Sequence, residues 1–138
     1  MRDAAVHAVS LGCRVFERFN WKEISKWSKK GDPRDLVSEA DRAIETAVRE
    51  FLLQETPEIP LIGEEFSPDT RVGEGKAWIL DPIDGTSNFL QGFEHFTISL
   101  GLLSGGFPEI GVVCNPLKEQ IYSAQRECGA FLNGTRIS

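Results

Sequence analysis

The stretch that decides the fold reads Ala77-Trp78-Ile79-Leu80-Asp81-Pro82-Ile83-Asp84-Gly85-Thr86. Its first four residues form a short apolar run, which is typical of a buried β-strand. The run ends at the carboxylate of Asp81, and a second carboxylate, Asp84, follows three residues later. Pro82 and Gly85 favour a turn around Asp84. The stretch therefore predicts a buried strand that ends in an acidic turn.

A second apolar run lies upstream, at residues 59–63, and it ends at Glu64. It predicts another short buried strand that also delivers a carboxylate at its C-terminal end. Between the two runs, residues 67–76 are polar and contain glycine, which predicts a loop. The two strands would thus present two carboxylates, Glu64 and Asp81, as candidate metal ligands.

The rest of the chain predicts helices first and strands afterwards. Apolar residues at helical spacing predict helices over residues 4–27 and 38–53, the second begun by a capping box of Ser38 and Asp41. Gly105-Gly106 predicts a hairpin turn. The remaining strand candidates are residues 97–103, 109–114 and 120–124, with one more short strand and a turn within 129–134. This order predicts an α+β fold, with two N-terminal helices packed on a largely antiparallel sheet.

Composition excludes several classes of protein. The chain has 138 residues and a formal net charge of −6, which argues against nonspecific nucleic-acid binding. No apolar run approaches the roughly 18 residues that cross a bilayer, so no membrane span is expected. Its cysteines, Cys13, Cys114 and Cys128, have an odd count and wide spacing that give no disulfide framework and no zinc pattern. A reducing cytoplasm is the expected location.

The acidic stretch suits a hard divalent cation. Mg²⁺ prefers oxygen ligands and takes carboxylates, backbone carbonyls and phosphate oxygens. Asp81 could bridge two ions, with the Ile83 carbonyl and Asp84 as further ligands, and ions about 3.5–4 Å apart form the clamp used in phosphoryl hydrolysis. The residues from Gly85 on can start a short helix whose N–H groups bind an anion. The alternative is an ordinary Asp-rich turn, but the preceding strand, Thr86 and the upstream carboxylate favour a metal site.

Several motifs resemble the inositol monophosphatase family. Residues 78–89 resemble the first signature of that family, Gly63-Glu64-Glu65 resembles its GEE element, and residues 35–41 resemble its D-x-V-[TS]-x-x-D element. Downstream, residues 111–116 and 129–134 match its framework, and all the elements occur in family order. The resemblance implies the first half of an αβαβα layered phosphatase fold and a Mg²⁺-dependent, lithium-sensitive phosphomonoesterase.

The resemblance also implies the metal ligands. Glu64, Asp81 and the carbonyl of Ile83 would hold the first Mg²⁺, and Asp81 with Asp84 the second. Glu64 would also lie near a third, weaker ion. Metal-activated water would attack the phosphorus of a small phosphorylated alcohol such as inositol monophosphate.

Three further residues are implied around the attacking water and the phosphate. Thr86, hydrogen-bonded to Asp41, would orient the water, and the amides of Gly85 and Thr86 would hold phosphate oxygens. Taken alone, Asp41 could also be only a helix-cap carboxylate.

The family's second signature, of the W-D-x-A-x-G type, does not occur in this sequence. Its Asp completes the second metal site in family members. We therefore expect residues 1–138 to be a single N-terminal metal-binding domain without its C-terminal domain, weakly active or inactive alone, and part of a homodimer in full-length form. The alternative is a noncatalytic metal-binding or assembly module derived from the same fold.

Overall fold

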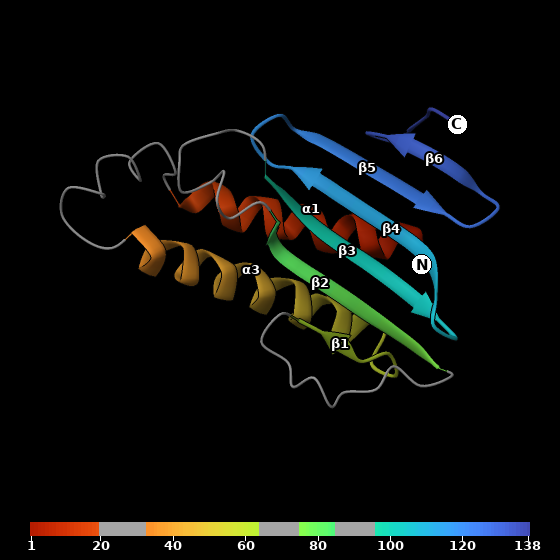
Figure 1. Ribbon diagram of the computed structural model, residues 1–138, viewed down its shortest axis with the longest axis horizontal. Helices are drawn as coiled ribbons and strands as arrows, with labels where there is room; N and C mark the ends of the chain where they lie inside the picture. Colours follow the sequence, from red (N-terminus) through yellow and green to blue (C-terminus); the bar gives the residue numbers. More distant parts are fainter. Residues whose placement is uncertain (20–32, 64–74, 85–95) are drawn as a thin grey trace.

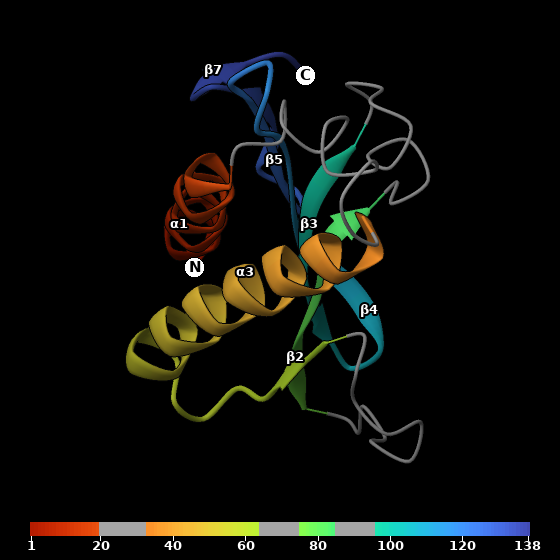
Figure 2. The same cartoon turned by 90° about the vertical axis from the view of Figure 1, so that its left-hand side faces the viewer.

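The computed structural model describes residues 1–19, 33–63, 75–84 and 96–138, with side chains of the second range described from residue 39 on. Within these residues, two helices cover one face of a seven-stranded sheet (Figures 1 and 2). All neighbouring strands pair antiparallel except the first two, which are parallel. This arrangement confirms the predicted α+β fold.

Helix α1 (Arg2–Arg18) buries one stripe of small and apolar side chains, among them Ala5, Val9 and Phe16. It crosses strands β3, β4 and β5 and packs along α3. The helix begins two residues before the predicted start, and the predicted residues 20–27 lie outside the described part. No helix in the described ranges has the length and hydropathy needed to cross a bilayer.

Helix α3 (Pro33–Glu55) begins earlier than the sequence predicted. The expected capping box at Ser38 is wrong, because Ser38 lies inside the helix rather than before it. Pro33 is the first helical residue, a position that suits proline, since its fixed φ is helical and its missing N–H would have no partner in the first turn. Toward the core, α3 buries Ala40, Ile44 and Val48.

The strands follow one another across the sheet in chain order. A turn at Gly105 and Gly106, with φ of 58° and 84°, joins β3 to β4 as predicted. The last strand, β7, was not predicted. The strands are β1 (Leu61–Ile62), β2 (Lys76–Asp84), β3 (Thr97–Ser104), β4 (Phe107–Asn115), β5 (Gln120–Gln125), β6 (Gly129–Leu132) and β7 (Thr135–Arg136).

Alternate residues of the sheet face the helices, and these form the core. Trp78 on β2 is fully buried, and its indole N–H donates a hydrogen bond to Thr56 Oγ1 at 3.0 Å. Thr56 Oγ1 in turn donates to the Leu52 carbonyl at 2.9 Å, just before α3 ends. The sheet and the end of α3 are thus joined by a buried polar chain as well as by apolar packing.

The opposite face of the sheet carries no helix in the described part of the chain (Figure 2). Ile79 faces that side, paired with Gly101, and is 39% exposed. Val113 and Tyr122, which pair with each other, are 39% and 43% exposed on the same face. This face matters for the site, because the same register places Asp81 on it.

Candidate metal centre

The acidic stretch of β2 is a strand with a bulge, not the predicted turn. Asp81 pairs with Ser99 of β3, and Asp84 pairs with Thr97. From Asp81 to Asp84 the chain advances three residues on β2, while their partners on β3 are only two residues apart. Strand β2 therefore carries one extra residue here, which is a β-bulge. Pro82 cannot donate a hydrogen bond to a neighbouring strand, so a bulge is a position where a strand tolerates it.

The bulge brings both carboxylates to one face of the sheet. In a regular strand, residues three apart point to opposite faces. Here the partners of Asp81 and Asp84 are two residues apart on β3 and so share a face, and the extra residue turns both carboxylates toward it. The side chain of Ile83, between them, is buried in the core at 2% exposure. The sequence thus places two acids three residues apart, and the bulge aligns them.

Two hydroxyls that the sequence analysis missed lie opposite these carboxylates. Thr97 and Ser99 are the register partners of Asp84 and Asp81, and their hydroxyl oxygens are 3.3 Å apart, at hydrogen-bonding distance. Both side chains are partly buried. The signal was present in the sequence as a Thr-x-Ser alternation at the start of an otherwise apolar strand. The carboxylates therefore lie beside two hydroxyl groups, whose oxygen atoms are further donors next to the candidate metal site.

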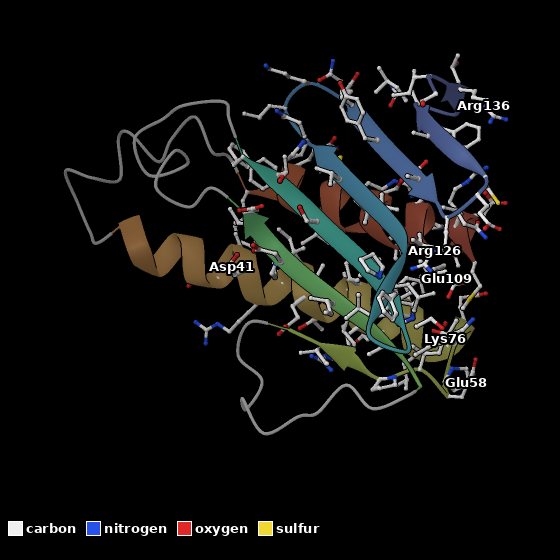
Figure 3. The ribbon with its side chains drawn as sticks, turned by 45° about the vertical axis from the view of Figure 1, so that its right-hand side comes forward. Asp41, Glu58, Lys76, Glu109, Arg126 and Arg136 are labelled. Atoms are coloured by element: carbon white, nitrogen blue, oxygen red, sulfur yellow. The ribbon has the colours of Figure 1, made fainter. Side chains whose placement is uncertain are left out.

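Asp41 approaches the same end of the molecule from the helical layer. It lies in the N-terminal half of α3, which packs on β2, and Figure 3 shows it near the end of β2 where the acidic stretch lies. One carboxylate oxygen, Asp41 Oδ1, is fully buried, as is Asp81 Oδ1. Asp41 is inside the helix, so the reading of this residue as a helix-cap carboxylate is wrong.

Strand β1 leads the chain toward the same end of the sheet. It pairs parallel to β2, with Leu61 opposite Trp78. Gly63, which follows β1 and precedes Glu64, lies against the side chain of Glu45 from α3. A Cβ added at Gly63 would overlap the Glu45 carboxylate, so glycine at this position allows the helix and the strand end to come together.

The close contact at Gly63 gives a first prediction. Gly63→Ala should lower the free energy of unfolding by about 1 kcal/mol, because the new methyl group displaces the Glu45 carboxylate. In a Glu45→Ala background the same change should cost nothing further, giving a coupling of about 1 kcal/mol in a urea-unfolding double-mutant cycle. Gly111→Ala is the matched control, since nothing lies within 4 Å of a Cβ added there. An equal cost of Gly63→Ala in both backgrounds would contradict the assigned contact.

Three predicted site residues, Glu64, Gly85 and Thr86, lie outside the described residues. Within ranges 1–19, 33–63, 75–84 and 96–138, no three His, Cys, Asp or Glu side chains gather closely enough to hold a metal ion. The described donors nevertheless fit a hard cation, because the side chains of Asp81 and Asp84 and those opposite them offer only oxygen atoms.

Comparison with solved structures supports the fold. The structure of inositol monophosphatase from Anabaena (Nostoc) sp. PCC 7120 superposes with a TM-score of 0.81 at 26% identity, covering 99% of this chain and 48% of that one. The inositol monophosphatase family profile matches residues 1–138. The chain belongs to the inositol monophosphatase family.

Two curated relatives show the range within the family. Inositol-1-monophosphatase of Rhizobium meliloti (strain 1021) is 44% identical over 110 residues, covering 80% of this chain and 41% of the relative. Histidinol-phosphatase of Chlorobaculum parvum (strain DSM 263 / NCIMB 8327) is 34% identical over 130 residues, covering 94% and 49%. The chain thus spans about half the length of the relatives it matches.

Proposed function

We propose that the protein containing this chain hydrolyses a small phosphate monoester, such as inositol monophosphate, with Mg²⁺ as cofactor. The observation that carries the proposal is the bulge in β2. It turns Asp81 and Asp84 to one face at the end of the sheet, in a chain of a family whose named relatives are phosphatases of inositol monophosphate and histidinol phosphate.

The chain's own oxygen atoms would hold the cofactor. Asp81 and Asp84, the carbonyl of Ile83 and the carboxylate of Glu64 are the proposed ligands of two Mg²⁺ ions, with a third, weaker ion near Glu64. Bound Mg²⁺ would neutralise phosphate charge and make water a better nucleophile. The chain's contribution is to fix the donors, and for Asp81, Ile83 and Asp84 the pairing of β2 with β3 supports this role.

Asp41 and Thr86 are the proposed pair that orients the attacking water. The Asp41 carboxylate would accept a hydrogen bond from the Thr86 hydroxyl. The oxygen of that hydroxyl would then be oriented to accept a hydrogen bond from the attacking water. The amides of Gly85 and Thr86 would donate to phosphate oxygens. The buried Asp41 Oδ1 supports this role, because a buried carboxylate keeps a fixed direction and is little screened by solvent.

The chain alone would hold an incomplete site. Its sequence contains no W-D-x-A-x-G element, and the relatives are about twice as long. We propose that residues 1–138 form an N-terminal metal-binding domain, which binds the first Mg²⁺ weakly and turns over little substrate by itself. Free thiols, including the exposed Cys128, favour a reducing cytoplasm as the location of the protein. We also expect a homodimer in the full-length form.

Calorimetric titration tests the proposal. Mg²⁺ added to the 138-residue chain should give saturable heat that Asp81→Asn abolishes, because Asp81 is a proposed ligand of the first ion. A full-length version should release phosphate from inositol monophosphate in a Mg²⁺-dependent, Li⁺-inhibited reaction. A full-length protein that binds Mg²⁺ without releasing phosphate would favour the noncatalytic module. Full turnover by the 138-residue chain would contradict the incomplete site.

A further inference from the structure

Two buried thiols meet between the helical layer and the sheet, far from the candidate metal centre in sequence. Cys13 lies on α1 and Cys114 lies on β4, and they are 9% and 2% exposed. Helix α1 crosses β4 directly (Figure 1). The two thiols lie close enough to shift each other's pKa, and both cysteines are free. The proposed phosphatase chemistry uses neither residue.

A cavity gives this pair access to small molecules. It has a volume of about 190 Å³ and is lined by both Cys13 and Cys114. Arg14, Glu17 and Glu119 also line it. Both thiols therefore border the same small space, which can admit a compact reagent although neither is freely exposed.

The contact between the thiols divides their roles. The pKa of Cys114 is lowered, chiefly because the Cys13 S–H donates a hydrogen bond to the Cys114 thiolate. The same hydrogen bond raises the pKa of Cys13, and burial and the nearby charge of Glu17 add to the increase. The thiolate is the reactive form of cysteine. Cys114 is therefore the group that reacts first, and Cys13 is positioned to follow.

We propose that Cys13 and Cys114 are a redox-active dithiol that is oxidised to an intramolecular disulfide by a small disulfide entering the cavity. The Cys114 thiolate attacks one sulfur of the reagent RSSR, forming a mixed disulfide and releasing RS⁻. Cys13 then loses its proton and attacks the Cys114 sulfur, expelling a second RS⁻. The two thiols are oxidised by two electrons, and the reagent is reduced to two RSH.

The new bond would tie α1 to β4 across about 100 residues of chain, a loop length for which cross-linking strongly restricts the unfolded state. The oxidised protein should therefore melt on the order of 10 °C higher than the reduced protein.

The test uses the Cys128→Ser variant, because Cys128 is exposed and would react on its own account. The probe is bis(2-hydroxyethyl) disulfide, chosen for its small size. Intact-mass analysis should show the loss of two hydrogen atoms, and non-reducing digestion should give one cross-linked peptide pair containing Cys13 and Cys114. Dithiothreitol should restore the original mass and the lower melting temperature.

Two matched variants complete the test. In the Cys128→Ser background, Cys13→Ala should stop at a hydroxyethylthio adduct on Cys114, and Cys114→Ala should stop at an adduct on Cys13. Neither variant should lose two hydrogen atoms, because the second thiol that closes the disulfide is missing. The mass measurement on the Cys128→Ser protein tests the proposal even if neither of these two variants folds. If the Cys128→Ser protein stays unmodified, or carries one adduct on each cysteine without losing two hydrogen atoms, the proposal is overturned.

Discussion

Asp81→Asn is expected to lower Mg²⁺-dependent phosphate release by the full-length protein by about 1,000-fold. Substituting a residue that only supports a metal ligand typically costs about 10–100-fold, so loss of a direct ligand should cost more. Asn keeps the shape of the side chain and removes its negative charge. The strand pairing of Asp81 with Ser99 uses backbone atoms and should survive. The fold should not weaken either, since a buried carboxylate oxygen becomes a neutral amide oxygen.

A steady-state phosphate assay and a thermal melt of the same preparation check this prediction. Glu109→Gln is the matched control, because it removes one carboxylate from the far end of the same sheet. Figure 3 shows Glu109 beside Lys76 at the end away from Asp41, and the two form an ion pair at 3.7 Å. The control should retain full turnover. Unchanged turnover in Asp81→Asn would remove the metal-ligand assignment, whatever the melting temperature.

The arrangement of the sheet could be predicted because local signals determine most of it. Gly105-Gly106 supplies two consecutive positive φ values, which is what a tight hairpin requires, and it fixes how β3 meets β4. Apolar alternation then places Leu100 and Val112 on the helix side, where they pair. Each hairpin depends on residues close in sequence, so the pattern alone is informative.

The bulge could not be predicted in the same way. Pro82 and Gly85 are common turn residues, and each directly follows an aspartate, so the sequence favours a turn. The strand continues to Asp84 because β3 offers pairing partners as far as Thr97, a contact from outside the stretch. The start of α3 at Pro33 could not be predicted either. A proline shortly after a glycine is as typical of a helix end as of a helix start.

The contact between Cys13 and Cys114 could not be predicted from the sequence. Cysteine spacing reveals a disulfide framework only in short chains with regular spacing. These two cysteines meet because α1 lies across β4, which is a matter of how layers pack. Similarly, nothing in the sequence places Glu45 against Gly63, since that contact joins a helix side chain to the end of a separate strand.

Trp78→Ala is expected to lower the free energy of unfolding of the chain by about 3–5 kcal/mol. Trp78 is among the largest fully buried side chains and lies where β2 meets the end of α3. Truncation would leave a cavity and would also remove the indole donor to Thr56 Oγ1. Since small domains are stable by about 5–15 kcal/mol in total, much of the chain should then unfold at modest urea concentrations.

The two contributions of Trp78 can be separated by urea unfolding followed by far-ultraviolet circular dichroism. Thr56→Val keeps the packing and leaves the indole N–H buried without its acceptor, which should cost about 1–3 kcal/mol. Ile79→Ala is the matched control on the same strand, because Ile79 is 39% exposed on the helix-free face and should cost less than about 1 kcal/mol. If Trp78→Ala costs no more than Ile79→Ala, then the helix layer does not depend on β2 at this point. The rigid support proposed for Asp81, three residues further along the strand, would then have to come from β3 alone.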